Sequence, residues 1–358
     1  MRSTQLIIDL SNIKKNINSI RNYLGNNVEI MPIVKANGYG THLNYCADIL
    51  NQFHYVGVAL LDEALQLKNN GYKNNIFILY PLSKEELQIA IKENFIVNGS
   101  NIFELIDDNV GNVKIHLEIE TGMGRTGLQE NNVEEYIYKL KSNSNIIVDG
   151  IFTHLSSSGS DRTFSINQIK KFERIVKIFT KSNINPTYKH VCCSGGLKNY
   201  KEYIYNMVRV GLLIYGYYPN SSLKNEIDLK PSMTLKTNIS FLKEINIGDT
   251  IGYNKNFVAK RRTRVATIPF GFADGLIGLE TGKPYVIVKN KPAKIIGICM
   301  DNMMLDVTDI LNVNVGDEVY IWDNDKLTIE EIGDWCNGIC NYEVMTSITE
   351  RVPRILKK

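Results

Sequence analysis

Along the first two thirds of the chain, short apolar runs alternate with longer segments whose apolar residues recur at helical spacing. The apolar runs predict strands at Glu29–Val34, Tyr55–Leu60, Asn75–Tyr80, Phe95–Val97, Lys114–Glu120, Ile146–His154, Lys189–Cys193 and Val208–Tyr215. The helical patterns lie between them, at Leu43–Phe53, Asp62–Asn69, Lys84–Lys92 and Ser165–Thr180. Repeated strand–helix units over about 220 residues favour a (β/α)8 TIM-type barrel, with a doubly wound open sheet as the main alternative.

The last third of the chain has a different pattern, because short strand-like segments follow one another with few long helices between them. Strands are predicted at Leu235–Leu242, Arg264–Ile268, Pro284–Val288, Lys294–Ile298, Met304–Val307 and Glu318–Ile321. This pattern is typical of a β-barrel or sandwich. We therefore predict an α/β barrel over residues 1–230 and an all-β domain over residues 231–358, with the linker near Pro219–Pro231.

The composition excludes several classes of protein. A net charge of +3 gives no basic field for nucleic acid, and 44% apolar with 22% charged residues is an ordinary globular composition. No apolar run reaches the roughly 18–20 residues of a membrane helix, and the N-terminus shows no signal peptide. Scattered cysteines, with Cys336 and Cys340 expected one helical turn apart, fit reduced thiols. We expect a cytoplasmic protein that binds neither nucleic acid nor membrane.

A lysine lies where the first predicted barrel strand ends. Active sites of such barrels lie at the C-terminal ends of the strands, and Lys35 directly follows Val34. Burial and a neighbouring cation lower the pKa of a lysine, and its neutral amine can form a Schiff base with an aldehyde. On spacing alone, a solvated loop lysine is the alternative.

Other predicted strand ends also carry polar groups. Arg125 follows the glycine turn Thr121–Gly124 and is suited to a carboxylate. His154 ends one predicted strand and His190 begins another. Arg209 lies inside an apolar strand, where an unpaired guanidinium would be very costly. Each residue alone has an ordinary explanation, as a core histidine or a surface arginine.

A turn of small residues, Ser194-Gly195-Gly196, can present backbone N–H groups to a phosphate. The pattern thus brings one lysine, two arginines, two histidines and this turn to one end of the predicted barrel. Such a set fits an anionic cofactor that carries an aldehyde, and pyridoxal 5'-phosphate fits best. The sequence contains no dinucleotide fingerprint after the first strand and no phosphate loop, and we expect no bound metal ion.

Seven motifs, in order, resemble those of the bacterial alanine racemase family, the fold-type III pyridoxal-phosphate racemases. They are Val34–Gly40, Gly122–Gly127, Phe152–His154, Arg209–Gly211 with Tyr215-Gly216, Pro269–Gly275, Cys299–Asp301 with Asp306–Thr308, and Arg351–Arg354. The resemblance implies a barrel and a β domain joined by a first strand near Gln5–Leu10. It also implies racemisation of alanine, giving D-alanine for peptidoglycan, by a head-to-tail homodimer in which each β domain completes the partner's site.

The resemblance also implies a role for each matching residue. Lys35 resembles the lysine that holds the cofactor, and Tyr253 resembles a second base on the opposite face of the substrate. Arg209 matches the arginine that faces the pyridine nitrogen, His190 the histidine that supports it, and His154 the histidine packed on the ring. The matches to phosphate-binding positions are Tyr39, Ser194, Gly211 and Leu212, and those to substrate-binding positions are Arg125 and Met300.

Four positions depart from the family pattern. Glu118 replaces a frequently carbamylated lysine, and we predict that its carboxylate pairs with Arg125 without modification. Cys193 replaces a frequent asparagine, Glu350 replaces a tyrosine near the phosphate, and Gly278 replaces an entry-channel arginine. These changes are expected to widen and repolarise the entry to the site, and they put strict specificity for alanine in question.

Three alternative functions are open. A racemase with the same mechanism would act on serine or on a basic amino acid paired with Glu350. A catalytically silent pyridoxal-phosphate-binding protein is disfavoured by Tyr253, Met300 and Asp301 in the last third. A related decarboxylase shares the barrel, but Gly122–Arg125 favours the racemase.

Overall fold

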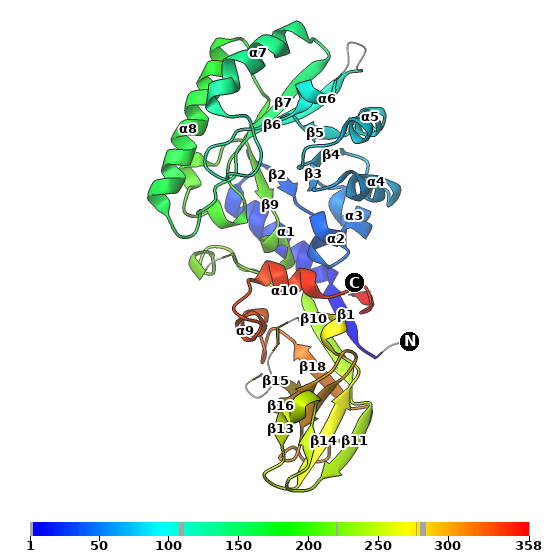
Figure 1. The fold of residues 1–358 in the computed structure, drawn as a ribbon. Helices are drawn as coiled ribbons and strands as arrows, with labels where there is room; N and C mark the ends of the chain where they lie inside the picture. Colours follow the sequence, from blue (N-terminus) through cyan, green and yellow to red (C-terminus); the bar gives the residue numbers. More distant parts are fainter. Residues whose placement is uncertain (1–2, 107–110, 220, 277, 280–283, 358) are drawn as a thin grey trace. The chain divides into compact units, whose positions relative to one another are not determined.

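A computed structural model of the chain describes residues 3–106, 111–219, 221–276, 278–279 and 284–357 (Figure 1). The chain divides into two compact units. The barrel unit comprises residues 14–38 and 42–229, and the β unit comprises residues 1–13, 39–41 and 230–358. No helix among the described residues is long and apolar enough to cross a lipid bilayer.

The strands of the barrel unit are all parallel to their neighbours. They are β2 (Glu29–Pro32), β3 (Tyr55–Val58), β4 (Asn75–Ile78), β5 (Ile96–Asn98), β6 (Val113–Glu118), β7 (Ile146–Phe152), β8 (Tyr188–His190) and β9 (Met207–Val210). Strands β3 to β8 form one sheet in chain order, and β2 pairs with β9. Single bridges, Ile33–Gly57 and Cys193–Arg209, join the two sheets at both seams. The strands therefore close into the predicted barrel.

Helices connect the strands of this unit and cover the barrel from outside (Figure 1). They are α1 (Leu10–Leu24), α3 (Ala47–Leu50), α4 (Leu61–Asn69), α5 (Lys84–Lys92), α6 (Ile102–Leu105), α7 (Val133–Ser142) and α8 (Arg162–Lys181). The segment labelled α2 (Lys35–Tyr39) is a turn with left-handed backbone that follows β2. Helix α8 shows why such segments form helices here. Asp161 accepts a hydrogen bond from the N–H of Phe164 (2.9 Å), and apolar side chains on one face are buried, including Ile169, Phe172 and Ile175.

Two predicted elements of this unit are wrong in extent. The strand predicted over Val208–Tyr215 ends at Val210, because Gly211 (φ −108°, ψ −92°) turns the chain into a 3-10 helix, Leu212–Tyr215. The helix predicted over Leu43–Phe53 is a 3-10 turn followed by the short α3. Cys46 between them has ψ 62°, so the helix cannot run through it.

The β unit contains a nine-stranded sheet in the order β11-β14-β17-β16-β15-β18-β10-β1-β19. Its strands are β1 (Gln5–Asp9), β10 (Met233–Asn238), β11 (Phe241–Ile245), β14 (Thr263–Ile268), β15 (Tyr285–Val288), β16 (Lys291–Ile298), β17 (Met303–Asp306), β18 (Glu318–Trp322) and β19 (Arg354–Lys357). Strand β1, from the start of the chain, pairs antiparallel with β10 and parallel with β19. The predicted class, an α/β barrel with a β domain, is confirmed.

Two short helices, α9 (Ile329–Trp335) and α10 (Asn341–Ser347), make the second unit mostly β rather than all-β. Cys336 follows α9 and Cys340 precedes α10, so the expectation that they lie on one helical turn is wrong. The strand predicted over Leu235–Leu242 is divided, because the chain turns between β10 and β11.

A small hairpin, β12 (Thr250–Ile251) with β13 (Phe257–Val258), leaves the main sheet of the β unit. Ile251 is 5% exposed and belongs to a buried cluster that also contains Ile245, Ala259, Val265 and Ile296. The hairpin loop, residues 252–256, is therefore anchored at its base. This loop carries Tyr253.

Candidate active site

Arg209, on β9, is a buried cation whose N–H donors find several acceptors. The residue is 3% exposed, and its Nη1 donates to the ring Nδ1 and to the carbonyl of His190, both at 2.8 Å. Nη2 donates to the carbonyls of Thr153 (2.8 Å) and Val191 (3.3 Å). Burial lowers the pKa of this group, but a guanidinium does not lose its proton in proteins. The predicted support of Arg209 by His190 is present.

His190 ends β8 rather than beginning a strand, and His154 lies two residues beyond the end of β7. The Nδ1 of His154 is 3.4 Å from Nη2 of Arg209. Burial, and then the positive charges of Arg209, Arg125 and Lys35, lower the pKa of His154 to about 3. The His154 ring is therefore neutral at physiological pH. The same electrostatic interactions place these four predicted residues around one end of the barrel.

Lys35 follows β2 at the same end of the barrel. Burial is the largest cause that lowers the pKa of its amine, and the positive charges of Arg125 and Arg209 act in the same direction. The carboxylate of Glu63 opposes them. A lowered pKa increases the fraction of neutral amine, which is the form that acts as a nucleophile or base.

The backbone after Lys35 is left-handed, which a sequence pattern does not predict. Ala36, Asn37, Gly38 and Tyr39 have φ between 52° and 63°. Non-glycine residues rarely adopt this region, and such conformations gather at functional sites where the surroundings hold them. Here Glu63 holds the turn, since its carboxylate accepts the N–H of Ala36 at 2.5 Å while also accepting that of Ala59 at 2.8 Å.

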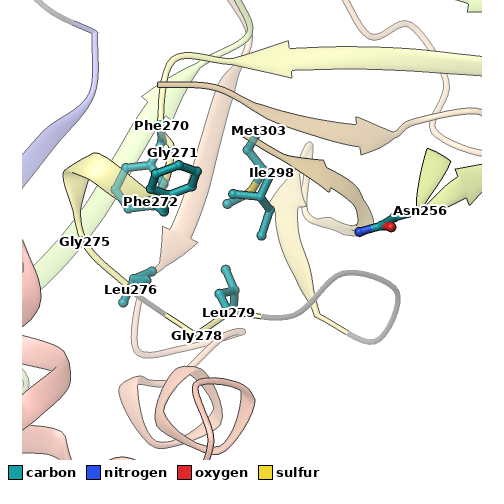
Figure 2. Close-up of a pocket in the computed structure, with 10 residues that line it drawn as sticks. All are labelled: Asn256, Phe270, Gly271, Phe272, Gly275, Leu276, Gly278, Leu279, Ile298 and Met303. Carbon is teal, nitrogen blue, oxygen red and sulfur yellow. The ribbon is translucent and has the colours of Figure 1, made fainter. Parts of the chain in front are cut away.

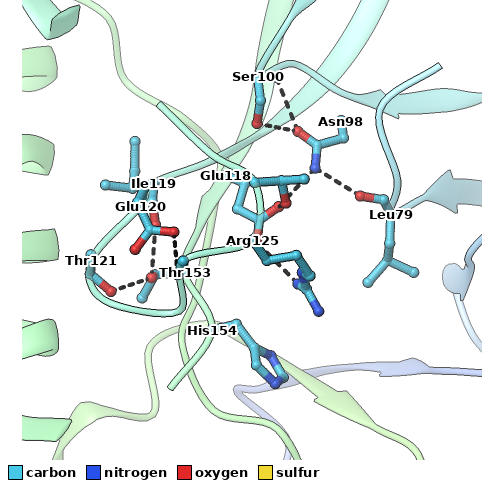
Figure 3. A network of polar contacts seen from close by, with 12 residues as sticks. Leu79, Asn98, Ser100, Glu118, Ile119, Glu120, Thr121, Arg125, Thr153 and His154 are labelled. Carbon is cyan, nitrogen blue, oxygen red and sulfur yellow. Dashed lines mark hydrogen bonds and ion pairs between the residues drawn. The ribbon is translucent and has the colours of Figure 1, made fainter. Parts of the chain in front are cut away.

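Glu118 ends β6 and forms the predicted ion pair with Arg125 (Figure 3). Its Oε1 lies 3.1 Å from Nη2 of Arg125, and its Oε2 accepts hydrogen bonds from Thr126 Oγ1 (2.5 Å) and Asn98 Nδ2 (3.0 Å). Glu118 is 2% exposed, whereas the side chain of Arg125 is 32% exposed. The buried carboxylate therefore orients a guanidinium whose other edge remains accessible.

The glycine turn before Arg125 is held by a second carboxylate. Glu120 accepts hydrogen bonds from the N–H groups of Gly122 and Gly124, the latter at 2.8 Å. Gly122 and Gly124 have φ of 139° and 69°, conformations that favour glycine. The turn thus fixes where the arginine leaves the backbone.

The predicted phosphate-binding residues of the barrel unit lie after β8 and β9. Ser194 is 2% exposed, and its Oγ accepts the N–H of Gly211 at 3.0 Å. Leu212 follows at the start of the 3-10 helix and is buried. Cys193, which is partly exposed, pairs with Arg209 in the bridge that closes the barrel. Hydroxyl and backbone N–H groups therefore adjoin the buried arginine.

The remaining predicted site residues belong to the β unit. Tyr39 is 8% exposed, and its ring centroid lies 5.7 Å from that of Tyr342. Tyr253 and Met300 are strongly exposed, at 65% and 53%. Tyr253 follows Gly252 (φ 77°) and precedes Asn254 (φ 53°), so a left-handed backbone adjoins this residue as well.

The departures in the β unit have defined surroundings. Glu350 is exposed, and its carboxylate lies 3.9 Å from Nη1 of Arg354. Gly278 has φ 91°, and a side-chain carbon at this position would come within 2.8 Å of Asn337. With Phe272, Leu276, Leu279 and other residues, Gly278 lines a cavity of about 610 Å³ (Figure 2). None of the predicted catalytic residues lines this cavity.

Sequence reasoning missed several polar residues behind the site. His116 on β6 is fully buried with its Nδ1 2.9 Å from Nε2 of His190, and Asp149 and Tyr55 continue this contact outward. Glu63 was missed as well, although it lies in the first turn of α4 and its side chain caps the start of that helix. A single histidine in an apolar strand gives only a weak signal, since most such residues are core residues.

The donor set of the barrel unit fits pyridoxal 5'-phosphate. A lysine with a lowered pKa can hold the aldehyde. The Ser194 oxygen accepts the N–H of Gly211, so the hydroxyl proton of Ser194 can be donated to a phosphate. Arg209 keeps its proton and so can only donate to an aromatic nitrogen. The barrel and this site together define a pyridoxal-phosphate enzyme of the barrel type.

Comparison with known proteins identifies the family. The alanine racemase N-terminal and C-terminal domain models match residues 8–219 and 232–356. Alanine racemase 1 of Clostridium acetobutylicum is 36% identical, the match covering 98% of this chain and 94% of the relative. The alanine racemase of Halothermothrix orenii is 34% identical, with 99% and 97% covered. This chain belongs to the alanine racemase family of pyridoxal 5'-phosphate-dependent isomerases.

Solved structures agree with this assignment. The alanine racemase of Clostridium difficile 630 superposes with a TM-score of 0.93 at 28% identity, covering 99% of this chain and 96% of that one. The alanine racemase of Bacillus anthracis, solved with bound L-Ala-P, gives 0.90 at 25% identity, covering 100% and 96%. The match extends over both units.

Proposed function

We propose that this protein interconverts L- and D-alanine with pyridoxal 5'-phosphate, and that Lys35 and Tyr253 are the two bases. The observation that carries the proposal is that Lys35, whose pKa is lowered, lies within electrostatic range of the buried guanidinium of Arg209, which His190 holds. The relatives of this chain that are named alanine racemases support the choice of substrate.

Pyridoxal phosphate, when bound, withdraws electrons from the α-carbon of the joined amino acid and so makes its α-proton removable. Lys35 would hold the aldehyde carbon, and Arg209 would donate a hydrogen bond to the pyridine nitrogen. Ser194, Gly211 and Leu212 would bind the phosphate together with Tyr39. Because Arg209 cannot give up its proton, it would only donate to that nitrogen and would favour its unprotonated form.

The released Lys35 amine takes the α-proton from one face of the substrate, and the phenol of Tyr253 returns a proton to the other face. Two bases on opposite faces allow inversion without moving either base across the substrate. Arg125, oriented by Glu118, would bind the substrate carboxylate. The proposed homodimer would bring Met300 of the partner subunit to the same carboxylate. His154 packs as a neutral ring, which avoids adding another positive charge to the cluster.

The proposal includes a homodimer in which Tyr253 of the partner subunit serves Lys35. Tyr253, Met300 and Phe272 are all large side chains of the β unit, and they are 65%, 53% and 44% exposed. The proposed partner would cover these side chains, as contiguous exposed apolar patches often mark surfaces that contact another protein. A second copy of the chain would cover these exposed side chains and would supply Tyr253 as the second base.

The proposed activity is tested with purified protein, L-alanine and pyridoxal phosphate, by following optical rotation. Lys35→Ala should abolish the yellow colour of the loaded protein and lower the rate by about 10³-fold or more, because both cofactor attachment and one base are lost. Serine, lysine and arginine are assayed beside alanine. A rate for any of these above that for alanine would replace alanine as the substrate.

The shared site is tested by mixing two inactive chains. Lys35→Ala and Tyr253→Phe chains are co-expressed, so that about half of the dimers carry one of each and regain a single complete site. Recovery of about a quarter of wild-type activity supports the shared site, since one of two sites is complete in half of the dimers. Activity that stays at the level of the separate variants would contradict it. The proposal also places the enzyme in the cytoplasm, which cell fractionation tests.

A further inference from the structure

A row of polar side chains continues from Arg209 away from the proposed substrate side. His190 Nε2 lies 2.9 Å from His116 Nδ1, and His116 Nε2 lies 3.5 Å from Asp149 Oδ2. The hydroxyl of Tyr55 donates to the same Asp149 oxygen at 2.8 Å. The proposed reaction uses Arg209 and His190 but assigns no role to the three outer residues.

The direction of each hydrogen bond follows from Arg209. A guanidinium only donates, so Nδ1 of His190 accepts and carries no proton. Neutral His190 then carries its proton on Nε2 and donates it to Nδ1 of His116. His116 must in turn carry its proton on Nε2, where Asp149 accepts it. Every bond in the row therefore points from the cation toward the carboxylate.

The ionisation states agree with this arrangement. Burial lowers the pKa of both His116 and His190, and the charge of Arg209 acts in the same direction on both. Asp149 opposes this effect at His116, but the pKa of His116 still lies below its ordinary value, so both rings are neutral. Partial burial opposes ionisation of Asp149, but the hydrogen bonds from His116 and Tyr55 outweigh it and lower its pKa. The row therefore runs from a buried cation to an ionised carboxylate whose side chain is 14% exposed.

The backbone is adapted to this row at the point where β6 meets β7. Ile115 pairs with Val148 and His116 pairs with Gly150, so Asp149 is an extra residue in a β-bulge. Bulges redirect side chains and are frequent near functional sites. A side-chain carbon on Gly150 would lie 2.6 Å from the His116 ring, so the ring occupies space that only glycine leaves free.

We propose that His116, oriented by Asp149, is a positioning residue that fixes the His190 ring and thereby the direction of Arg209. This inference rests on the proposed role of Arg209 toward the pyridine nitrogen. His116 supplies the single acceptor that a neutral His190 with a protonated Nε2 requires. Without that acceptor, a buried N–H group has no partner, and the ring must move or exchange its proton to the nitrogen that faces Arg209.

The test uses two pairs of variants in the full-length protein. His116→Asn keeps an oxygen near the Nδ1 position, whereas His116→Leu removes the acceptor at similar volume. Asp149→Asn keeps an acceptor for His116, whereas Asp149→Ala removes it. Glu173→Ala is the matched control, because Glu173 also accepts a tyrosine hydroxyl, that of Tyr205 at 3.1 Å, in the same unit but touches no histidine in this row.

The first readout is ¹⁵N NMR of ring nitrogens in histidine-labelled protein, recorded with and without pyridoxal phosphate. The chain has only five histidines, so the spectrum is assignable by substitution. His116→Leu should shift the His190 Nε2 resonance in both samples, and Asp149→Ala should shift the His116 Nε2 resonance. The two conservative variants and Glu173→Ala should leave the His190 resonances near their wild-type positions.

The second readout separates kcat from KM for alanine. Loss of an orienting partner of this kind costs roughly 10–100-fold in activity, so kcat should fall by that factor in His116→Leu and by roughly tenfold in Asp149→Ala. KM should change little, because neither residue touches the substrate. His116→Asn and Asp149→Asn should recover most of the loss, and if His116→Leu does not fold, the Asp149 pair decides.

Unchanged His190 resonances in His116→Leu, or equal losses of kcat in the alanine and asparagine variants of Asp149, would overturn the proposal. The NMR readout without cofactor does not depend on the reaction. If the wild-type protein fails to racemise alanine while the variants show the expected resonance shifts, the proposed function is refuted and the positioning role remains.

Discussion

The two proposed bases lie in opposite surroundings. Lys35 is in a barrel end where carboxylates, histidines and arginines hold one another, and Arg209 beside it is 3% exposed. Tyr253 lies on a hairpin loop of the β unit and is 65% exposed. The barrel half of the site is thus preorganised within one chain, whereas the phenol lacks such a shell in the described part of its own chain. In the proposed homodimer, the Tyr253 half of the site is therefore the half that depends on assembly.

The two regions share one feature, which is a left-handed backbone at the base. Ala36 and Asn37 follow Lys35, and Asn254 and Lys255 follow Tyr253, all with φ near 52°. Such residues are held at a cost by their surroundings. In the barrel unit the Glu63 carboxylate accepts a hydrogen bond from the N–H of Ala36. In the β unit the base of the hairpin is anchored by the buried side chain of Ile251.

The largest effect on racemisation is expected from a change of Tyr253, the exposed base. Tyr253→Phe should slow racemisation by about 10²–10⁴-fold, because one of the two proton transfers loses its catalyst. Exchange of the α-proton with deuterated water should survive for one enantiomer only, since Lys35 remains. Tyr138→Phe, at a tyrosine that is 73% exposed, should change nothing. Equal loss of exchange for both enantiomers would show that Tyr253 is not a base for one face.

A smaller effect is expected when Arg125, in the preorganised barrel unit, loses its partner Glu118. Glu118→Ala removes the partner of Arg125 and two further hydrogen bonds, so KM for alanine should rise by roughly tenfold and unfolding free energy should fall by about 1–3 kcal/mol. Steady-state kinetics and urea titration measure the two effects. Glu120→Ala is the control, because it frees the same turn without removing the ion pair. If Glu120→Ala raised KM as much as Glu118→Ala, the turn rather than the ion pair would orient Arg125.

The smallest effect concerns stability and pH. The pKa of Lys35 is lowered from 10.5 in the folded chain, so folding is penalised while the buried amine is protonated. Lys35→Met should therefore stabilise the cofactor-free protein most below the lowered pKa, and the difference should shrink as pH rises toward 10.5. Thermal unfolding at a series of pH values measures this. A difference that grows as pH rises would contradict the lowered pKa.

Much of the site could be predicted because barrel strands all end on the same side. Lys35, Arg125 and His154 were each predicted from their place at or near a strand end, and Arg209 from its place inside an apolar strand. The electrostatic interactions among them place them together. The pairing of Glu118 with Arg125 was predicted from the resemblance to the racemase family, in which a modified lysine often takes the place of Glu118, and the structure shows the ion pair.

The row behind Arg209 could not be predicted in this way. Tyr55 and Asp149 are 94 residues apart along the chain. The bulge that brings Asp149 next to the His116 ring is a property of how β6 and β7 pair. The short extent of β9 was also missed, because apolar residues continue through Leu212–Tyr215 into a buried 3-10 helix with no change in hydrophobicity.

The sequence by itself determined the order of strands and helices, the side of the barrel where polar groups gather, and the residues that resemble a racemase. These depend on periodicity and on local motifs, which neighbouring residues encode. Only the tertiary structure decided which ring nitrogen of each buried histidine carries the proton, how Glu63 holds the left-handed turn, and that Tyr253 is exposed. Burial and hydrogen-bond direction arise when distant segments exclude water from one another, so no local pattern contains them.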